Sequence, residues 1–147
     1  MHKRILVPTD GSRLSRRAIE YAARLAKSCG AKLTFLNVQS TVPMAYPLEW
    51  PAGYQLSRRD LAEAARLAAG RVLEEAIKLA EEADVSSDSV AVFDKPPHEA
   101  IIATARNKRC DLIVMAAHGR RGIKGLLLGS ETQKVLTHCK TPLLVHR

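Results

Sequence analysis

The sequence predicts a single α/β domain with a mostly parallel sheet, and three observations lead to this class. The chain has 147 residues, which fits one domain (1–147) with a hydrophobic core of its own. Short apolar runs alternate along it with longer segments whose apolar residues recur every three or four positions. Aromatic residues make up only 4% of the chain, so we expect an aliphatic core. Such alternation is typical of a parallel sheet with helices on both faces.

Five short apolar runs are expected to be strands. The run at 111–116 is the clearest, because it is apolar on both faces, as a buried parallel strand requires. The expected strands in chain order are 5–8, 33–38, 90–93, 111–116 and 141–146.

Helices are expected between these strands. Apolar residues recur at helical spacing from Leu14 to Cys29, and Gly30 follows as a C-cap signal. A long amphipathic helix is expected from Leu61 to Ala83. Pro96 and Pro97 open a third helix, since proline is tolerated in a first turn. A fourth helix is expected to start near Ser130.

The chain is basic, with a formal net charge of +8 and a pI of about 9.8. This charge attracts phosphate-bearing partners, but basic helix faces on an ordinary protein would give the same balance. A nucleic-acid-binding surface commonly interleaves stacking aromatic residues with basic ones. Here three aromatic residues gather in one loop, away from most lysines and arginines: Tyr46, Trp50 and Tyr54. Nucleic acid is therefore not an expected partner.

Cysteine usage and the absence of a targeting pattern favour a cytoplasmic protein. The three cysteines are widely spaced with no CxxC, which argues against a disulfide framework and a zinc site. The chain runs from its first residues straight into a strand pattern, so no signal peptide is expected. No apolar run approaches the ~20 residues that a bilayer requires, and we expect no membrane partner.

A ligand is expected at the carboxyl ends of two strands. In open parallel sheets, ligands bind there at the point where the strand order reverses. If the first strand is central, the turn at 8–12 faces the segment 116–130 across the crevice. Gly129 and Ser130 stand at a helix N-terminus, which attracts anions. The segment also contains residues that allow close backbone approach or add positive charge, and together they predict a polyphosphate cradle: Gly119, Gly122, Gly125, Arg120, Arg121 and Lys124.

Each of these features taken alone has a plainer interpretation. Ser130 and Gln133 match a capping box, which needs no ligand. Asp10 and the glycine after it match an ordinary turn, and the later glycines could serve only as turn residues. His118 could be a loop histidine with its hydrogen bonds satisfied, and neither the P-loop pattern nor GxGxxG is present. We favour the functional interpretation because all of these residues converge on one predicted crevice.

With those residues in view, the chain resembles the universal stress protein family over nearly its whole length. The similarity runs from Ile5-Leu6-Val7-Pro8-Thr9-Asp10-Gly11-Ser12 to Pro142-Leu143-Leu144-Val145. The ATP-binding motif of that family is a glycine, two residues, a glycine, nine residues, and Gly-Ser or Gly-Thr. Here it reads Ala116-x-x-Gly119-x9-Gly129-Ser130, with Ala116 in place of the first glycine. Because alanine has the smallest side chain after glycine, we expect this replacement to be tolerated.

The resemblance implies the fold, the assembly and the ligand. The fold would be an open five-stranded parallel sheet of order 3-2-1-4-5, of the adenine nucleotide alpha hydrolase-like type. The assembly would be a homodimer joined through the closing strand at 142–146. The ligand would be ATP or AMP, and an accompanying Mg²⁺ ion is compatible with the same site.

The resemblance also implies roles for several site residues. Asp10 would meet the adenine or ribose end of the nucleotide, and Val38 would present backbone groups to the adenine edge. Backbone N–H groups of residues 119, 129, 130 and 131 would contact the phosphates. The complete predicted site is Pro8, Thr9, Asp10, Val38, Met115, Ala116, His118, Gly119, Arg120, Gly129, Ser130, Glu131 and Thr132.

The family implies slow or absent ATP hydrolysis, so we expect a nucleotide-responsive regulator in stress response or signalling rather than an enzyme. A slow ATPase that uses the same site, with His118 or Asp10 assisting, is the first alternative. The second is an interaction module without nucleotide. In that case the proline-rich segment 39–56 and the basic surface would engage a protein or nucleic-acid partner. The segment is longer than most loops and could instead form a lid.

Overall fold

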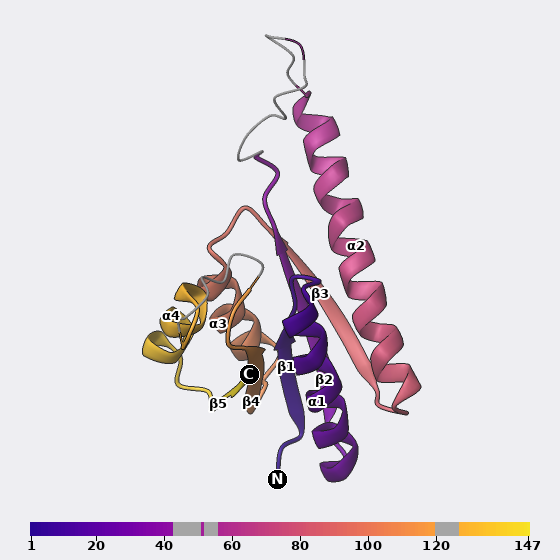
Figure 1. Cartoon of the computed structure of the whole chain (residues 1–147), viewed down its shortest axis with the longest axis vertical. Helices are drawn as coiled ribbons and strands as arrows, with labels where there is room; N and C mark the ends of the chain where they lie inside the picture. Colours follow the sequence, from indigo (N-terminus) through magenta and orange to yellow (C-terminus); the bar gives the residue numbers. More distant parts are fainter. Residues whose placement is uncertain (43–50, 52–55, 120–126) are drawn as a thin grey trace.

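The sheet has the predicted parallel order, with its first strand in the centre. The structure is a computed structural model that describes residues 1–42, 51, 56–119 and 127–147. Among these residues the strands pair in the order β3-β2-β1-β4-β5 (Figure 1). Their bounds are β1 (Arg4–Pro8), β2 (Lys32–Gln39), β3 (Ser87–Phe93), β4 (Leu112–Ala116) and β5 (Leu143–His146).

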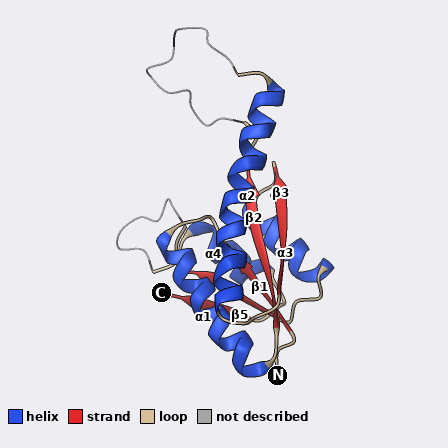
Figure 2. Ribbon diagram, turned by 90° about the vertical axis from the view of Figure 1, so that its right-hand side faces the viewer, coloured by secondary structure: helices blue, strands red, loops and turns tan. Residues whose placement is uncertain are grey.

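The described helices cover both faces of this sheet. Helices α1 (Arg13–Cys29) and α2 (Arg58–Glu82) lie on one face, and α3 (Pro97–Asn107) and α4 (Ser130–His138) lie on the other (Figure 1). Figure 2 shows the long α2 running alongside β2 and β3. None of the described helices combines the length and apolar character needed to cross a membrane.

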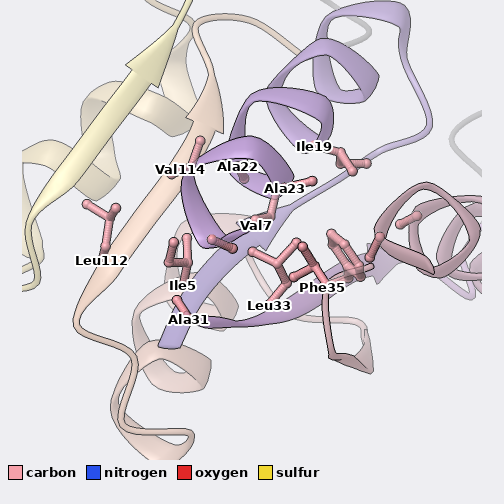
Figure 3. Close-up of a cluster of buried hydrophobic side chains, with 14 of the residues drawn as sticks. Ile5, Val7, Ile19, Ala22, Ala23, Ala31, Leu33, Phe35, Leu112 and Val114 are labelled. Carbon is pink, nitrogen blue, oxygen red and sulfur yellow. The ribbon is translucent and has the colours of Figure 1, made fainter. Parts of the chain in front are cut away.

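Alternation along the strands places apolar side chains on both faces. From β1, Ile5 and Val7 pack against α1, while Leu6 points into the cluster beneath α3 and α4. Figure 3 shows the first cluster, in which Leu33 and Phe35 of β2 lie together with Ile5 and Val7 of β1 and small residues of α1. Every residue of β4 is buried, as predicted for a parallel strand that is apolar on both faces.

Most predicted elements are confirmed, with boundaries moved by a few residues. Strand β3 begins earlier than expected, at Ser87, because Ser87–Ser89 pair with Leu33–Phe35 of β2. Those residues are polar because β3 is an edge strand, so hydrophobicity could not reveal them. The segment expected to be irregular from residue 39 starts one position later, since Gln39 still pairs with β3. Residues 43–50 and 52–55 of that segment lie outside the described residues.

Candidate functional site

A cleft of about 860 Å³ opens at the carboxyl edge of the sheet, where the ends of β1, β2 and β4 meet the first turns of α3 and α4. This volume lies within the range typical of small-molecule sites. Every predicted site residue that the structure describes lines this cleft. Arg120, and with it Arg121 and Lys124, lies outside the described residues.

The two segments predicted to face one another meet above the middle of the sheet as far as the structure describes them, at 8–12 on one side and at 116–119 and 127–130 on the other. Strand β1 pairs with β4, so the turns that follow these two strands lie side by side. A Cβ atom built on Gly119 would lie 2.9 Å from Oδ2 of Asp10, closer than real Cβ contacts allow. Glycine at 119 therefore lets the second segment approach the Asp10 carboxylate.

The turn after β1 is held by hydrogen bonds of its own side chains. Oδ1 of Asp10 accepts from the Ser12 backbone N–H at 2.9 Å. Ser12 is the N-cap of α1, and its hydroxyl accepts from the Ser15 backbone N–H at 3.2 Å. The buried Thr9 hydroxyl donates to the Ser15 hydroxyl at 3.1 Å. The turn interpretation of Asp10 is thus confirmed, and the same bonds fix its carboxylate at the cleft.

Asn37 is a cleft residue that the sequence analysis did not select. Its side chain is 1% exposed, and Nδ2 donates to the backbone carbonyl of Thr9 at 2.8 Å. Its Oδ1 accepts from Nε2 of Gln39 at 2.9 Å. Asn37 therefore ties the end of β2 to the end of β1. The available signal was a single amide side chain inside the apolar run 33–38.

The apolar wall of the cleft comes from the α3 and α4 side of the sheet. Met115 and Leu36 belong to the core cluster on that face, and Val38 packs against it. Ile101 of α3 joins the same cluster and also lines the cleft, although the sequence analysis did not include it. Ala116 is 8% exposed at the end of β4. A planar ligand could make apolar contacts with this wall, next to the backbone at the ends of β2 and β4.

The start of α4 presents backbone N–H groups to the cleft. Gly129 is the N-cap and supplies no side-chain acceptor. The first intrahelical bond runs from the Gln133 N–H to the Gly129 carbonyl at 3.0 Å. Among the described residues, the N–H groups of Ser130, Glu131 and Thr132 have no hydrogen-bond acceptor. Free N–H groups of this kind, together with the helix dipole, favour an anion.

The backbone N–H of Gly129, which was expected to contact a phosphate, already has a hydrogen-bond acceptor in the structure. The Gly129 N–H donates to the carbonyl of Ala117 at 2.6 Å, because the chain turns back over β4 before α4 begins. A Cβ atom at 129 would lie 3.2 Å from that carbonyl oxygen and 3.4 Å from Cα of His118. Glycine at 129 therefore allows close packing against the backbone of residues 117 and 118, and its own N–H is not available to a ligand.

The predicted capping box of Ser130 and Gln133 is wrong. Gly129 takes the N-cap position, so Ser130 is already the first residue of the helix and its side chain makes no cap. The Gln133 amide instead donates through Nε2 to the carbonyl of Leu128 at 3.2 Å. Thr132 anchors the turn in another way, since its buried hydroxyl donates to the carbonyls of Ala116 and Ala117.

His118 differs from a satisfied loop histidine. Its Nδ1 atom is buried and has no hydrogen-bond partner among the described residues. The ring packs near Gly129, where a Cβ atom would lie 3.8 Å from Nδ1. No described acid orients this imidazole, which would be needed for a general base.

The Glu131 carboxylate is engaged by neighbours on both sides. Oε2 accepts from the backbone N–H of His98 at 2.8 Å and lies 3.0 Å from Nδ1 of its ring. Oε1 accepts from Nζ of Lys134 at 3.1 Å. Burial opposes ionisation, but the His98 and Lys134 contacts outweigh it and hold the pKa of Glu131 below its ordinary value.

At the far rim of the cleft, Asp94 holds the segment that leaves β2. Its carboxylate accepts from the backbone N–H of Thr41 at 2.8 Å and from the Thr41 hydroxyl at 2.6 Å. These two bonds, with burial acting weakly in the opposite direction, keep the pKa of Asp94 below its ordinary value. Asp94 has a φ of 55°, a left-handed conformation that aspartate tolerates better than most residues.

Comparison with known proteins places this geometry in a family. The profile of the universal stress protein family matches residues 1–147. The universal stress protein MJ0531 of Methanocaldococcus jannaschii is 32% identical over 99% of this chain and 82% of its own length. A universal stress protein solved in complex with cAMP is 25% identical, covers 99% of this chain and 97% of its own, and superposes with a TM-score of 0.73.

A family protein from Arabidopsis thaliana, solved with AMP bound, shares the fold. It is 18% identical, its alignment covers 97% of this chain and 90% of its own, and the TM-score is 0.68. The sheet order, the full-length profile match and the relative from Methanocaldococcus agree. This chain belongs to the universal stress protein family.

Proposed function

We propose that this protein binds an adenine nucleotide, ATP or AMP, in the cleft at the carboxyl edge of the sheet and acts as a nucleotide-responsive regulator in stress response or signalling. One observation carries the proposal. The same cleft joins an apolar wall at Met115 and Val38 to the amides at the start of α4, which have no acceptor among the described residues, and the Asp10 carboxylate also lines it.

Each part of a nucleotide has a matching part of the cleft. The base would lie against Val38 and Met115, and exposed backbone groups at the end of β2 would bind its edge. Asp10 would accept a hydrogen bond from a ribose hydroxyl, since it lines the cleft and a carboxylate is a hydrogen-bond acceptor. The phosphates would contact the N–H groups of residues 130–132, the Ser130 hydroxyl and Gly119.

The family supports the same ligand class. The relatives described above were solved with cAMP and with AMP, both of which are adenine nucleotides with one phosphate. The present chain keeps the motif residues Gly119, Gly129 and Ser130, and the methyl group of Ala116 is the departure. Where ATP is the ligand, Mg²⁺ would be held chiefly by the phosphates, and Asp10 is the carboxylate in the cleft that could contact it.

A regulator fits the side chains better than an enzyme does. Phosphoryl transfer needs a residue that positions the attacking water and groups that stabilise developing charge. Glu131 is engaged by His98 and Lys134, and no described residue orients His118. Phosphate release from ATP should therefore be slow and change little in His118→Ala. A steep fall in that variant, with nucleotide affinity retained, would instead make the protein an ATPase.

Binding itself is tested by calorimetry and thermal unfolding with AMP, ATP, adenosine and GMP. A ligand that binds only the folded state stabilises it by RT ln(1 + [L]/Kd), about 2.7 kcal/mol at one hundred times Kd. We expect AMP and ATP to raise the melting temperature and GMP to raise it much less. No shift with any adenine nucleotide, and no nucleotide in the mass spectrum of the purified protein, would favour an interaction module.

The proposal also includes a cytoplasmic location and a homodimer formed through residues 142–146. Strand β5 is an edge strand whose residues are all half-buried, so its outer backbone is open to pairing. Sedimentation should give a dimer that becomes monomeric when proline replaces Val145.

A further inference from the structure

The Glu131 side chain joins the first turns of α3 and α4, the two helices whose starts line the cleft. Its Oε2 atom accepts from the His98 backbone N–H at 2.8 Å and lies 3.0 Å from Nδ1 of the same residue. Because a carboxylate only accepts, Nδ1 carries the proton in this contact. The His98 side chain is 19% exposed and the Glu131 side chain 34% exposed, so solvent weakens their interaction less than it weakens one between fully exposed side chains.

Helix α3 has no side-chain cap from its own segment. Its N-cap is Pro96, which makes no cap hydrogen bond, and Pro97 has no N–H to donate. The His98 N–H is thus the first amide of the helix, and its acceptor comes from Glu131, 33 positions later in the chain. A residue of α4 therefore performs the capping that α3 lacks.

The same contact orients the Glu131 carboxylate, which belongs to the first turn of α4, where the phosphates are expected to bind. A carboxylate in the first turn of α4 that reached into the cleft would repel a phosphate at the Ser130 amide. Here it is bonded to α3, and Lys134 opposes its charge. With the Thr132 hydroxyl bonded to β4, the contact gives the turn a second anchor.

We propose that Glu131 is a positioning residue: the bond from its carboxylate to His98 holds the first turn of α4 with its amides open toward a phosphate. This inference rests on the proposed function. It predicts that the side chain affects the phosphate-dependent part of nucleotide affinity and leaves the affinity for adenosine nearly unchanged.

Calorimetry with AMP and adenosine tests the inference in Glu131→Ala, Glu131→Gln and His98→Ala. Glu131→Ala should weaken AMP binding about three- to tenfold, because a partly buried hydrogen bond to a charged group is lost. The adenosine affinity should change less than about twofold. Glu131→Gln should recover most of the AMP affinity, since its amide oxygen can still accept from the His98 N–H. His98→Ala keeps that N–H and should show a smaller loss than Glu131→Ala.

Glu63→Gln is the matched control, because it removes one carboxylate that pairs with Arg66 on the exposed side of α2. It should leave both affinities unchanged. Tighter AMP binding in both Glu131 variants would mean that charge repulsion outweighs positioning, and would overturn the inference. Equal AMP affinities in the wild type and all variants would also overturn it, while the proposed function stands. Wild-type protein that binds no AMP would overturn both. If Glu131→Ala does not fold, His98→Ala is compared with the wild type instead, and an AMP affinity unchanged in that variant would overturn the inference.

Discussion

At the residue scale, the site depends on small side chains where two segments approach each other. Gly119 leaves room for the Asp10 carboxylate, and Gly129 packs on the backbone of residues 117 and 118. The sequence predicted both glycines through their spacing. Asn37 and His98 could not be predicted in this way, because their partners lie in other elements and are brought together only by folding.

Replacement of Gly129 by valine should abolish AMP binding while the fold is retained. Even the first carbon of the new side chain would lie 3.2 Å from the Ala117 carbonyl, so the α4 turn must shift from the cleft. Calorimetry measures the loss, and far-UV circular dichroism checks the fold. An affinity equal to wild type would refute the phosphate site at this turn.

Gly70→Ala is the matched glycine variant and gives a prediction of its own. Gly70 lies inside α2, and a Cβ atom there meets no atom within 4 Å. Alanine should raise the free energy of unfolding by about 0.5–1 kcal/mol, because glycine is a poor helix former. Urea unfolding measures this change. AMP affinity should stay the same, and a decrease would mean that α2 communicates with the cleft.

Asn37→Leu should lower the free energy of unfolding by about 1–3 kcal/mol. Leucine has a similar shape but leaves the Thr9 carbonyl and the Gln39 amide without this partner. Urea denaturation of the nucleotide-free protein measures the effect. A stability equal to wild type would show that the bond between the ends of β1 and β2 contributes little.

At the element scale, apolar patterning predicted the strands and helices well, and failed where polar residues form structure. β3 begins in Ser87–Ser89, whose strand conformation depends on pairing with β2. The predicted start of α4 near Ser130 is confirmed, but the capping-box interpretation is wrong because Gly129 is the N-cap. The strand order came from the family resemblance, since alternation alone predicts parallel strands without fixing their neighbours.

The amino ends of three strands are joined by one carboxylate, which predicts a pH dependence. The Oδ2 atom of Asp88 in β3 lies 3.0 Å from Nη1 of Arg4 in β1 and 3.4 Å from Nζ of Lys32 in β2. Burial opposes its ionisation, but bonds with Thr34 and Arg4 and nearby lysine charges outweigh this, so the pKa of Asp88 is lowered. A lowered pKa contributes stability above the unfolded-state pKa, and this stability is lost as the pH falls through the folded-state value.

Asp88→Asn should therefore cost on the order of 1 kcal/mol at pH 7, after allowance for solvent screening, and less at pH 3. Urea unfolding at both pH values measures the difference. Asp84→Asn is the control, because that side chain is 85% exposed beside Lys27 and should have a smaller effect. An equal loss for Asp88→Asn at both pH values would contradict the ion-pair explanation.

At the scale of the whole molecule, a central β1 brings residues 8–12 to the same edge of the sheet as residues 116–119 and 127–130. The net charge of +8 adds a long-range attraction for anions. High salt should therefore weaken ATP binding more than adenosine binding, because screening acts on the phosphates. Titrations at low and high ionic strength measure both affinities. Equal salt sensitivity would count against basic residues, including Arg120, Arg121 and Lys124, as phosphate partners.

Nucleotide binding in the cleft is tested most directly by an NMR titration of the ¹⁵N-labelled protein with AMP. We expect saturable shifts at the amides of Gly119, Ser130 and Glu131 and around Asp10, with little change in α2. Adenosine should reproduce the shifts near Asp10 and Val38 but not those at the start of α4. AMP shifts that are absent, or that fall on other surfaces, would contradict nucleotide binding in this cleft.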